Sequence, residues 1–161
     1  MVDKDKDLFQ EFLKIAGNLN NELDIVPVLY GSLGLQMKSG IDFEPEDIDV
    51  LVPLKFLNEK WSNLREVVER MGYTFVDLRE HEFHKSGIKL AFTFMEDLAD
   101  FAGVDYRTLE TMEMSGVKYH ILQVDDFLKV YTRSLSDSYR RTKNNNKDAN
   151  KIHIIEEMLN Q

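Results

Sequence analysis

Apolar residues recur every three or four positions in several stretches of the chain, a spacing that predicts amphipathic helices. The expected helices cover residues 3–23, 55–71, 124–135 and a run that begins after residues 144–146. Gly72 directly follows the second stretch, at the position where a glycine commonly ends a helix. Shorter helices are expected over residues 31–39 and in the segment MEDLADFAG, which ends at Gly103.

Between these stretches, short apolar runs predict strands over residues 25–30, 47–53, 73–78 and 88–94. The segment TLETMEMSGVKYHIL predicts a hairpin that turns at Ser115 and Gly116. Helices alternating with strands predict an α/β (α+β) fold, in which a mixed sheet is flanked by helices and followed by a helical C-terminal segment. A length of 161 residues suits one domain. We expect its core over about residues 23–122 and the helical segment over about 123–161.

Composition narrows the class of protein. Hydrophobic residues make up 43% of the chain and charged residues 30%, as in ordinary globular proteins. The absence of cysteine excludes disulfides, thiolate metal sites and cysteine nucleophiles. No apolar stretch is long enough to span a bilayer, and the charged N-terminus is unlike a signal peptide, so a cytoplasmic location is the default expectation.

The charge of the chain is unevenly distributed. A formal net charge of −9 disfavours binding to long nucleic acids. Between Lys129 and Lys151, however, seven basic residues stand against two acidic ones. This segment either faces an anionic ligand or forms a solvated helix surface, and the sequence leaves both interpretations open.

A glycine-serine pair, Gly31 and Ser32, follows the first expected strand and begins the next expected helix. A turn of this kind offers free backbone N–H groups and a helix N-terminus to a phosphate. Two other phosphate loops are excluded. Met37 stands where the P-loop requires a glycine before Lys38 and Ser39, and the glycine spacing of a dinucleotide fingerprint is missing. A Gly-Ser pair alone is a weak signal, because it is more often an ordinary helix start.

The strand over residues 47–53 begins with Asp47, Ile48 and Asp49. Because strand side chains alternate between faces, the two aspartates share one face while Ile48 points into the core. Carboxylates this close repel each other unless a cation lies between them, and oxygen ligands suit Mg²⁺. A calcium loop that starts at Asp42 is excluded, because Asp47 and Pro53 stand where that loop requires glycine and glutamate.

Taken together, the two motifs resemble those of the nucleotidyltransferase superfamily that includes DNA polymerase beta. The resemblance rests on Tyr30-Gly31-Ser32, fourteen intervening residues, and an acidic-apolar-acidic-apolar run at residues 47–50. The gap is slightly longer than is usual in the family. The resemblance covers about residues 23–95 and is strongest to small bacterial members, the minimal and lincosamide nucleotidyltransferases.

This resemblance implies transfer of a nucleoside monophosphate from a nucleoside triphosphate to a small-molecule or protein acceptor, with two Mg²⁺ ions. It implies that Asp47 and Asp49 are the metal ligands and that Gly31 and Ser32 contact the triphosphate. Family members usually place a third carboxylate on a later strand. The candidates for this catalytic acid are Asp77 in GYTFVDLRE, which strand alternation places on the face of Phe75, and its rival Glu96.

The segment RRTKNNNKDANK resembles the helical part of antibiotic-modifying nucleotidyltransferases, and the phosphate contacts predicted from this part of the chain are Lys129, Arg133, Arg140 and Lys147. His81 and His84 would form a zinc site only with a further ligand. Two other functions stay open: a non-catalytic nucleotide-binding or regulatory module, and an antitoxin-like protein-interaction module of the same fold. The base, the acceptor and the oligomeric state are not determined by these patterns.

Overall fold

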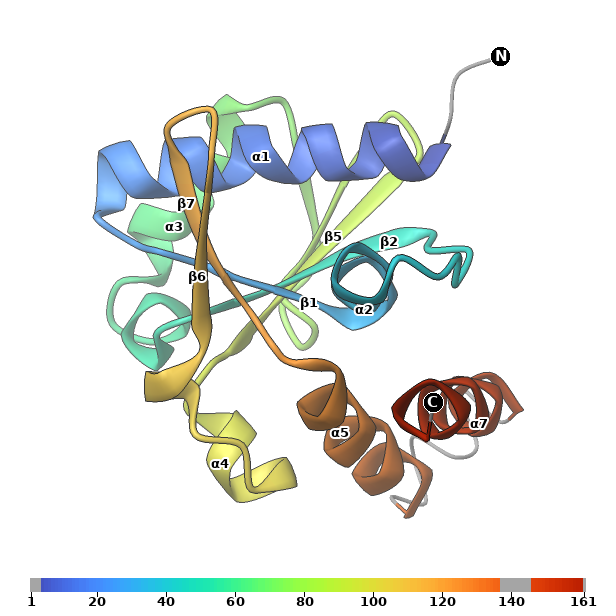
Figure 1. Cartoon of the computed structure of the whole chain (residues 1–161). Helices are drawn as coiled ribbons and strands as arrows, with labels where there is room; N and C mark the ends of the chain where they lie inside the picture. The colour runs from blue at the N-terminus through green and yellow to red at the C-terminus, as the bar shows by residue number, and fades with distance from the viewer. Residues whose placement is uncertain (1–3, 137–145, 161) are drawn as a thin grey trace.

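A seven-stranded mixed sheet runs through the computed structural model, which describes residues 4–136 and 146–160 (Figure 1). The strand order is β3-β4-β5-β2-β1-β7-β6. The strands are β1 (Val28–Tyr30), β2 (Asp47–Val52), β3 (Thr74–Asp77), β4 (Glu82–Lys85), β5 (Ile88–Phe94), β6 (Glu110–Met114) and β7 (Val117–Ile121). Parallel pairing joins β2 to β5 and β1 to β7, and the other neighbours are antiparallel.

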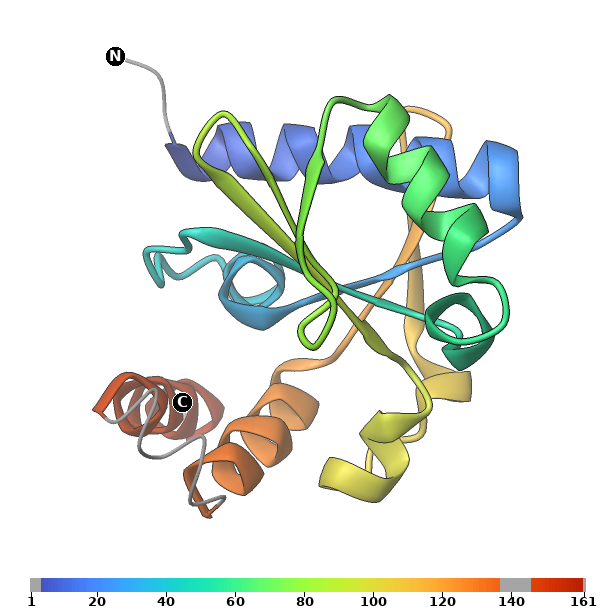
Figure 2. The same cartoon turned by 180° about the vertical axis from the view of Figure 1, so that it is seen from behind.

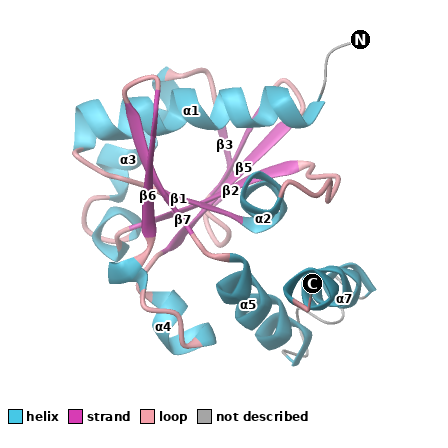
Figure 3. Ribbon diagram, viewed as in Figure 1, coloured by secondary structure: helices cyan, strands magenta, loops and turns pink. Residues whose placement is uncertain are grey.

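Helices cover both sides of this sheet, as the colouring of Figure 3 makes clear. The α-helices are α1 (Lys4–Leu23), α2 (Gly31–Ser39), α3 (Trp61–Arg70), α4 (Asp97–Ala102), α5 (Val124–Ser136) and α7 (Asn146–Leu159). Helices α1 and α3 lie on one side, and α4, α5 and α7 lie on the other (Figures 1 and 2). Two short 3-10 helices complete the fold, η1 (Leu54–Leu57) and η2 (Tyr106–Thr108). No helix in the described part of the chain is long and apolar enough to cross a membrane.

The core is built by alternation along the central strands. Ile48 and Val50 of β2 are completely buried, as are Leu90 of β5 and Phe83 of β4. Helix α1 packs onto the sheet through aromatic rings, and the ring of Phe12 meets that of Tyr119 edge-on at 5.3 Å between centroids. The residues between the buried positions of β2 and β5 therefore point to the opposite face of the sheet.

This architecture confirms the predicted mixed sheet with flanking helices. Helix α2 and strand β5 have the predicted bounds. The helix predicted over residues 55–71 is instead divided into η1 and α3, because the backbone leaves helical geometry at Asn58 (φ −118°, ψ −105°). Strand β4 was not predicted, since Phe83 is its only buried residue and its other side chains are polar.

A β-bulge changes the register of the edge strand β3. Phe75 pairs with Phe83, whereas Asp77 pairs with Glu82, the residue before Phe83. A bulge puts two residues of one strand opposite one residue of its partner, so simple alternation fails across it. The prediction that Asp77 shares the face of Phe75 relied on that alternation and does not hold.

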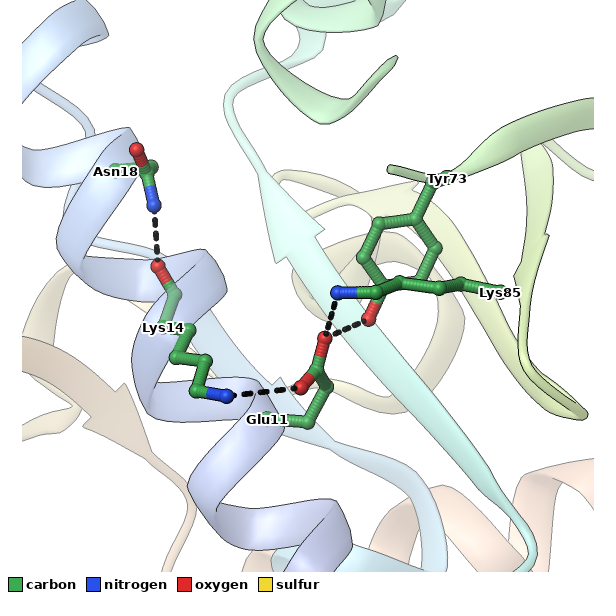
Figure 4. Close-up of polar contacts among 5 residues, drawn as sticks. All are labelled: Glu11, Lys14, Asn18, Tyr73 and Lys85. Carbon is green, nitrogen blue, oxygen red and sulfur yellow. Dashed lines mark hydrogen bonds and ion pairs between the residues drawn. The ribbon is translucent and has the colours of Figure 1, made fainter. Parts of the chain in front are cut away.

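A single buried acid ties α1 to the β3–β4 part of the sheet (Figure 4). Glu11 is only 9% exposed, and its Oε1 atom accepts hydrogen bonds from the Tyr73 hydroxyl at 2.8 Å and from Lys85 Nζ at 3.1 Å. Lys14 Nζ lies 3.8 Å from the other carboxylate oxygen. Burial acts to raise the pKa of Glu11, but the two hydrogen bonds and the charges of the two lysines outweigh it and lower that pKa. The ionised form of Glu11 is therefore the one that stabilises the fold.

We expect Glu11→Gln to lower the free energy of unfolding by about 2 kcal/mol at pH 7, because the buried Tyr73 hydroxyl and the partly buried Lys85 ammonium lose their charged acceptor. A lowered folded-state pKa means that this stabilisation is present above the ordinary value of 4.5 and is lost as the pH falls through the folded-state pKa. The difference between wild type and variant should therefore shrink below pH 4.5. Urea unfolding over a pH series measures this difference in the free energy of unfolding. Glu59→Gln, at an exposed position, is the control. A difference that does not change with pH would contradict this account.

Candidate active site

A cavity of about 530 Å³ opens between the polar face of the sheet, the loop before β2, and helices α5 and α7. Its volume lies in the range of small-ligand sites. The residues that line it are Tyr30, Gly31, Ser32, Asp42, Phe43, Glu44, Glu46, Asp47, Asp49, Val50, Leu51, Glu80, Glu82, Lys89, Ala91, Thr93, Phe127, Val130, Tyr131, Ser134, Asn150, Lys151 and Ile154. The cavity thus contains both the glycine-serine turn and the aspartate pair.

The turn and the pair are brought together by the antiparallel pairing of β1 with β2. Tyr30, the last residue of β1, pairs directly with Asp49. The chain then turns at Gly31, whose φ is +65°, and begins α2. A Cβ atom at Gly31 would overlap the Oδ2 atom of Asp49. Glycine is therefore required here both by the backbone conformation and by the close approach of the carboxylate.

The next strand of the sheet, β5, contributes a lysine rather than an acid. Lys89 is the parallel partner of Asp47, and Ala91 is the partner of Asp49. Lys89 Nζ lies 3.3 Å from Oε1 of Glu82, which projects from β4 opposite Ala91. Burial acts to lower the pKa of Lys89, but the charges of Asp47, Glu82 and Asp49 and the hydrogen bond to Glu82 raise it. The ammonium group is therefore held in its charged form among these carboxylates.

Neither predicted third acid joins the aspartate pair. Strands β4 and β5 separate Asp77 from β2, and the Asp77 carboxylate accepts the N–H of Arg79 at 2.9 Å. The Glu96 carboxylate accepts the N–H of Leu54 at 3.0 and 3.1 Å, which fixes the start of η1. Both residues are absent from the cavity lining.

The two histidines also fail to converge. The ring of His81 packs against that of Trp61, with 4.9 Å between centroids, whereas His84 Nε2 lies 2.8 Å from Oε2 of Glu82. Among residues 4–136 and 146–160, no group of three or more His, Asp or Glu side chains is arranged to hold a metal ion. The donor set that does fit a hard divalent cation is the pair of carboxylates on one strand face, Asp47 and Asp49.

Two of the four predicted basic contacts are engaged elsewhere. Lys129 forms an ion pair with Asp126 at 3.5 Å, and the Arg133 guanidinium lies 5.7 Å from the ring centroid of Phe101. Neither lines the cavity. Arg140 and the side chain of Lys147 are outside the described residues. The C-terminal segment contributes Lys151 of α7 instead, whose Nζ lies over the ring of Tyr131 at 5.1 Å.

The cavity is strongly acidic and has one aromatic wall. Seven acidic residues line its described surface against two lysines, Lys89 and Lys151. The rings of Tyr30, Phe127 and Tyr131 follow one another, with 6.5 Å between successive centroids. An anionic ligand could enter such a cavity only with cations that offset the carboxylates, whereas a flat apolar group could lie against the rings.

Two solved structures resemble this one over most of the chain. An antigenic nucleotidyltransferase-like protein from Paracoccidioides brasiliensis superimposes with a TM-score of 0.59 at 15% identity, over 92% of this chain and 75% of that one. The antibiotic-resistance factor ANT(2'')-Ia superimposes with a TM-score of 0.55 at 12% identity, over 98% and 93% of the two chains. The protein therefore has the nucleotidyltransferase fold.

Sequence comparison then places the chain within a family. It is 54% identical over 152 residues to the uncharacterized protein YnaI of Bacillus subtilis strain 168, a match that covers 94% of this chain and 97% of that protein. No known family model matches the sequence. The chain belongs to the same family as YnaI.

The contact between Gly31 and Asp49 gives a stability prediction. We expect Gly31→Ala to lower the free energy of unfolding by about 3 kcal/mol, because it combines an unfavourable positive φ with displacement of the Asp49 carboxylate. Gly40→Ala is the matched control. It also has positive φ, at the end of α2, but its Cβ would meet nothing within 4 Å, so about 1 kcal/mol is expected. Urea unfolding gives both values.

Adding Asp49→Ala to Gly31→Ala should recover part of the lost stability, since the overlapping oxygen is then gone. Equal costs for the two glycine variants would show that the close approach of Asp49 costs nothing.

Proposed function

We propose that this protein is a Mg²⁺-dependent nucleotidyltransferase, which moves a nucleoside monophosphate from a nucleoside triphosphate to a small-molecule or protein acceptor. One observation carries the proposal: the glycine-serine turn lies directly against Asp49, in the same cavity as Asp47. A phosphate-binding turn and a metal-binding acid pair can contact the same triphosphate only when they lie this close together. The fold shared with nucleotidyltransferases supports the same reaction class.

The residues of the cavity have distinct roles in this proposal. Gly31 lets the backbone approach the triphosphate, and Ser32 offers it a hydroxyl and an N–H at the start of α2. Asp47 and Asp49 hold Mg²⁺. When bound, the metal would supply positive charge to the phosphate oxygens and to the leaving pyrophosphate. The rings of Phe127 and Tyr131 offer a surface for the nucleoside.

In the transfer step an acceptor hydroxyl oxygen forms a bond to the α-phosphorus while the bond from that phosphorus to the pyrophosphate oxygen breaks. The hydroxyl proton leaves to a base, and the electron pair of the broken bond leaves with pyrophosphate. The acidic lining repels a long nucleic acid and favours a neutral or cationic acceptor. Positioning and charge supply most of the catalysis in reactions of this kind.

A second candidate function is nucleotide binding without transfer, in a regulatory module of the same fold. It is favoured by the positions of Asp77 and Glu96, which leave the aspartate pair without the predicted third carboxylate. Magnesium-dependent pyrophosphate release, measured with each of the four triphosphates and a mixture of candidate acceptors, separates the two. Binding without release under all conditions would favour the second function.

We expect Asp47→Asn and Asp49→Asn each to weaken triphosphate binding at least about tenfold in the presence of Mg²⁺, because each removes one anionic metal ligand. Both aspartates lie on the cavity face of β2 rather than in the core, so the fold should remain intact. Isothermal titration calorimetry with a non-hydrolysable ATP analogue measures the affinity, and thermal unfolding checks the fold. The exposed Asp125→Asn is the control. Wild-type affinity in both variants would refute the metal-site assignment.

A further inference from the structure

Strand β5 runs parallel to β2, the strand that carries the aspartate pair, and it contributes the cationic side chain of Lys89. We propose that the Lys89 ammonium takes the place of a second divalent cation, so that the triphosphate complex holds a single metal ion, at Asp47 and Asp49, and Lys89 supplies the second positive charge to the phosphates. This inference rests on the proposed function and specifies how that site is charged.

The backbone register fixes the position of Lys89. Asp47 and Lys89 are direct partners in the parallel pair of β2 and β5, so their Cα atoms lie about 4.8 Å apart and their side chains share a face. On the same face, Glu82 of β4 is the antiparallel partner of Ala91. Ala91 therefore lies between Asp49 and Glu82 on this face and adds no charge of its own.

The charges around Lys89 explain why its ammonium lies there. It is 3.3 Å from Glu82 Oε1, and the charges of Asp47 and Asp49 attract it as well. Glu82 is itself only 14% exposed and is held from its other side by His84 at 2.8 Å. Carboxylates gathered in this way would ordinarily bind a metal, yet in the described part of the chain no three of them converge on a common metal position. The cation found at this place is the Lys89 ammonium, which is paired with Glu82.

Charge and hydrogen bonding then limit the number of metal ions. A second divalent cation beside Asp47 would have to displace an ammonium of like charge and would find Glu82 already paired. The ammonium has three N–H donors on a flexible stem, so it can keep one carboxylate contact and donate to a phosphate oxygen as well. A lysine at this position therefore supports phosphate binding without the third acidic ligand.

Mn²⁺ is the probe for the test, because free and bound Mn²⁺ can be counted by electron paramagnetic resonance. With a non-hydrolysable triphosphate, we expect one Mn²⁺ per wild-type chain and two per Lys89→Asp chain, in which a third carboxylate replaces the ammonium. Lys89→Met should still bind one Mn²⁺ but should bind the triphosphate about tenfold or more weakly, because a charge-assisted contact is lost. Lys118→Met, a strand lysine that does not line the cavity, should behave as wild type.

Two Mn²⁺ ions in the wild-type complex, or wild-type triphosphate affinity in Lys89→Met, would overturn the inference. Counting the bound Mn²⁺ in the protein without triphosphate tests the inference about Lys89 separately from the proposed function. If no variant binds triphosphate, the nucleotidyltransferase proposal fails, but Lys89→Asp should still gain an Mn²⁺ site that wild type lacks. Thermal unfolding provides the second measurement: Mn²⁺ should raise the melting temperature of Lys89→Asp more than that of wild type. An equal rise together with an equal Mn²⁺ count would refute the role of Lys89.

Discussion

The register of β2 is the constraint on which the rest of the site depends. Ile48, Val50 and Val52 are completely buried, and this burial fixes which face of the strand points toward the cavity. A slip of one residue would place these apolar side chains in the cavity and drive Asp47 and Asp49 into the core, at a prohibitive cost in desolvation. The same register pairs Asp49 with Tyr30, so the turn at Gly31 necessarily meets the carboxylate. The alternation of side chains between the two faces of β2 therefore sets both the core packing and the geometry of the site.

Acidic residues near the sheet serve two different purposes in this protein. Glu11 and Glu96 are satisfied inside the fold, the first by Tyr73 and Lys85 and the second by the backbone N–H of Leu54. Such acids fix the position of α1 and the start of η1, and neither lines the cavity. Among the acids of the cavity, in contrast, Glu82 is paired with the side chains of Lys89 and His84. The distinction follows from burial and partners rather than from residue type.

The shared fold and the local charges carry different information. The likeness to two nucleotidyltransferase-like structures, at 12% and 15% identity, defines the backbone architecture. Function depends on the side chains placed on that backbone. Here β5 offers Lys89 and Ala91 to the aspartate pair, and α7 offers Lys151. Under the proposed function, the charge balance of the cavity, more than the fold, should decide how many metal ions bind and which acceptors enter.

Local periodicity was sufficient to predict most of the helices and strands, the glycine-serine turn and the aspartate pair, because each of these depends on residues close together in the chain. The sequence could not reveal β4, whose single buried residue leaves no apolar run, or the bulge that breaks alternation before Asp77. Tertiary structure alone decided that Lys89 and Glu82 lie beside the pair and that Asp77 and Glu96 do not. These outcomes depend on which strands pair and in what register, a property of contacts between residues distant in sequence.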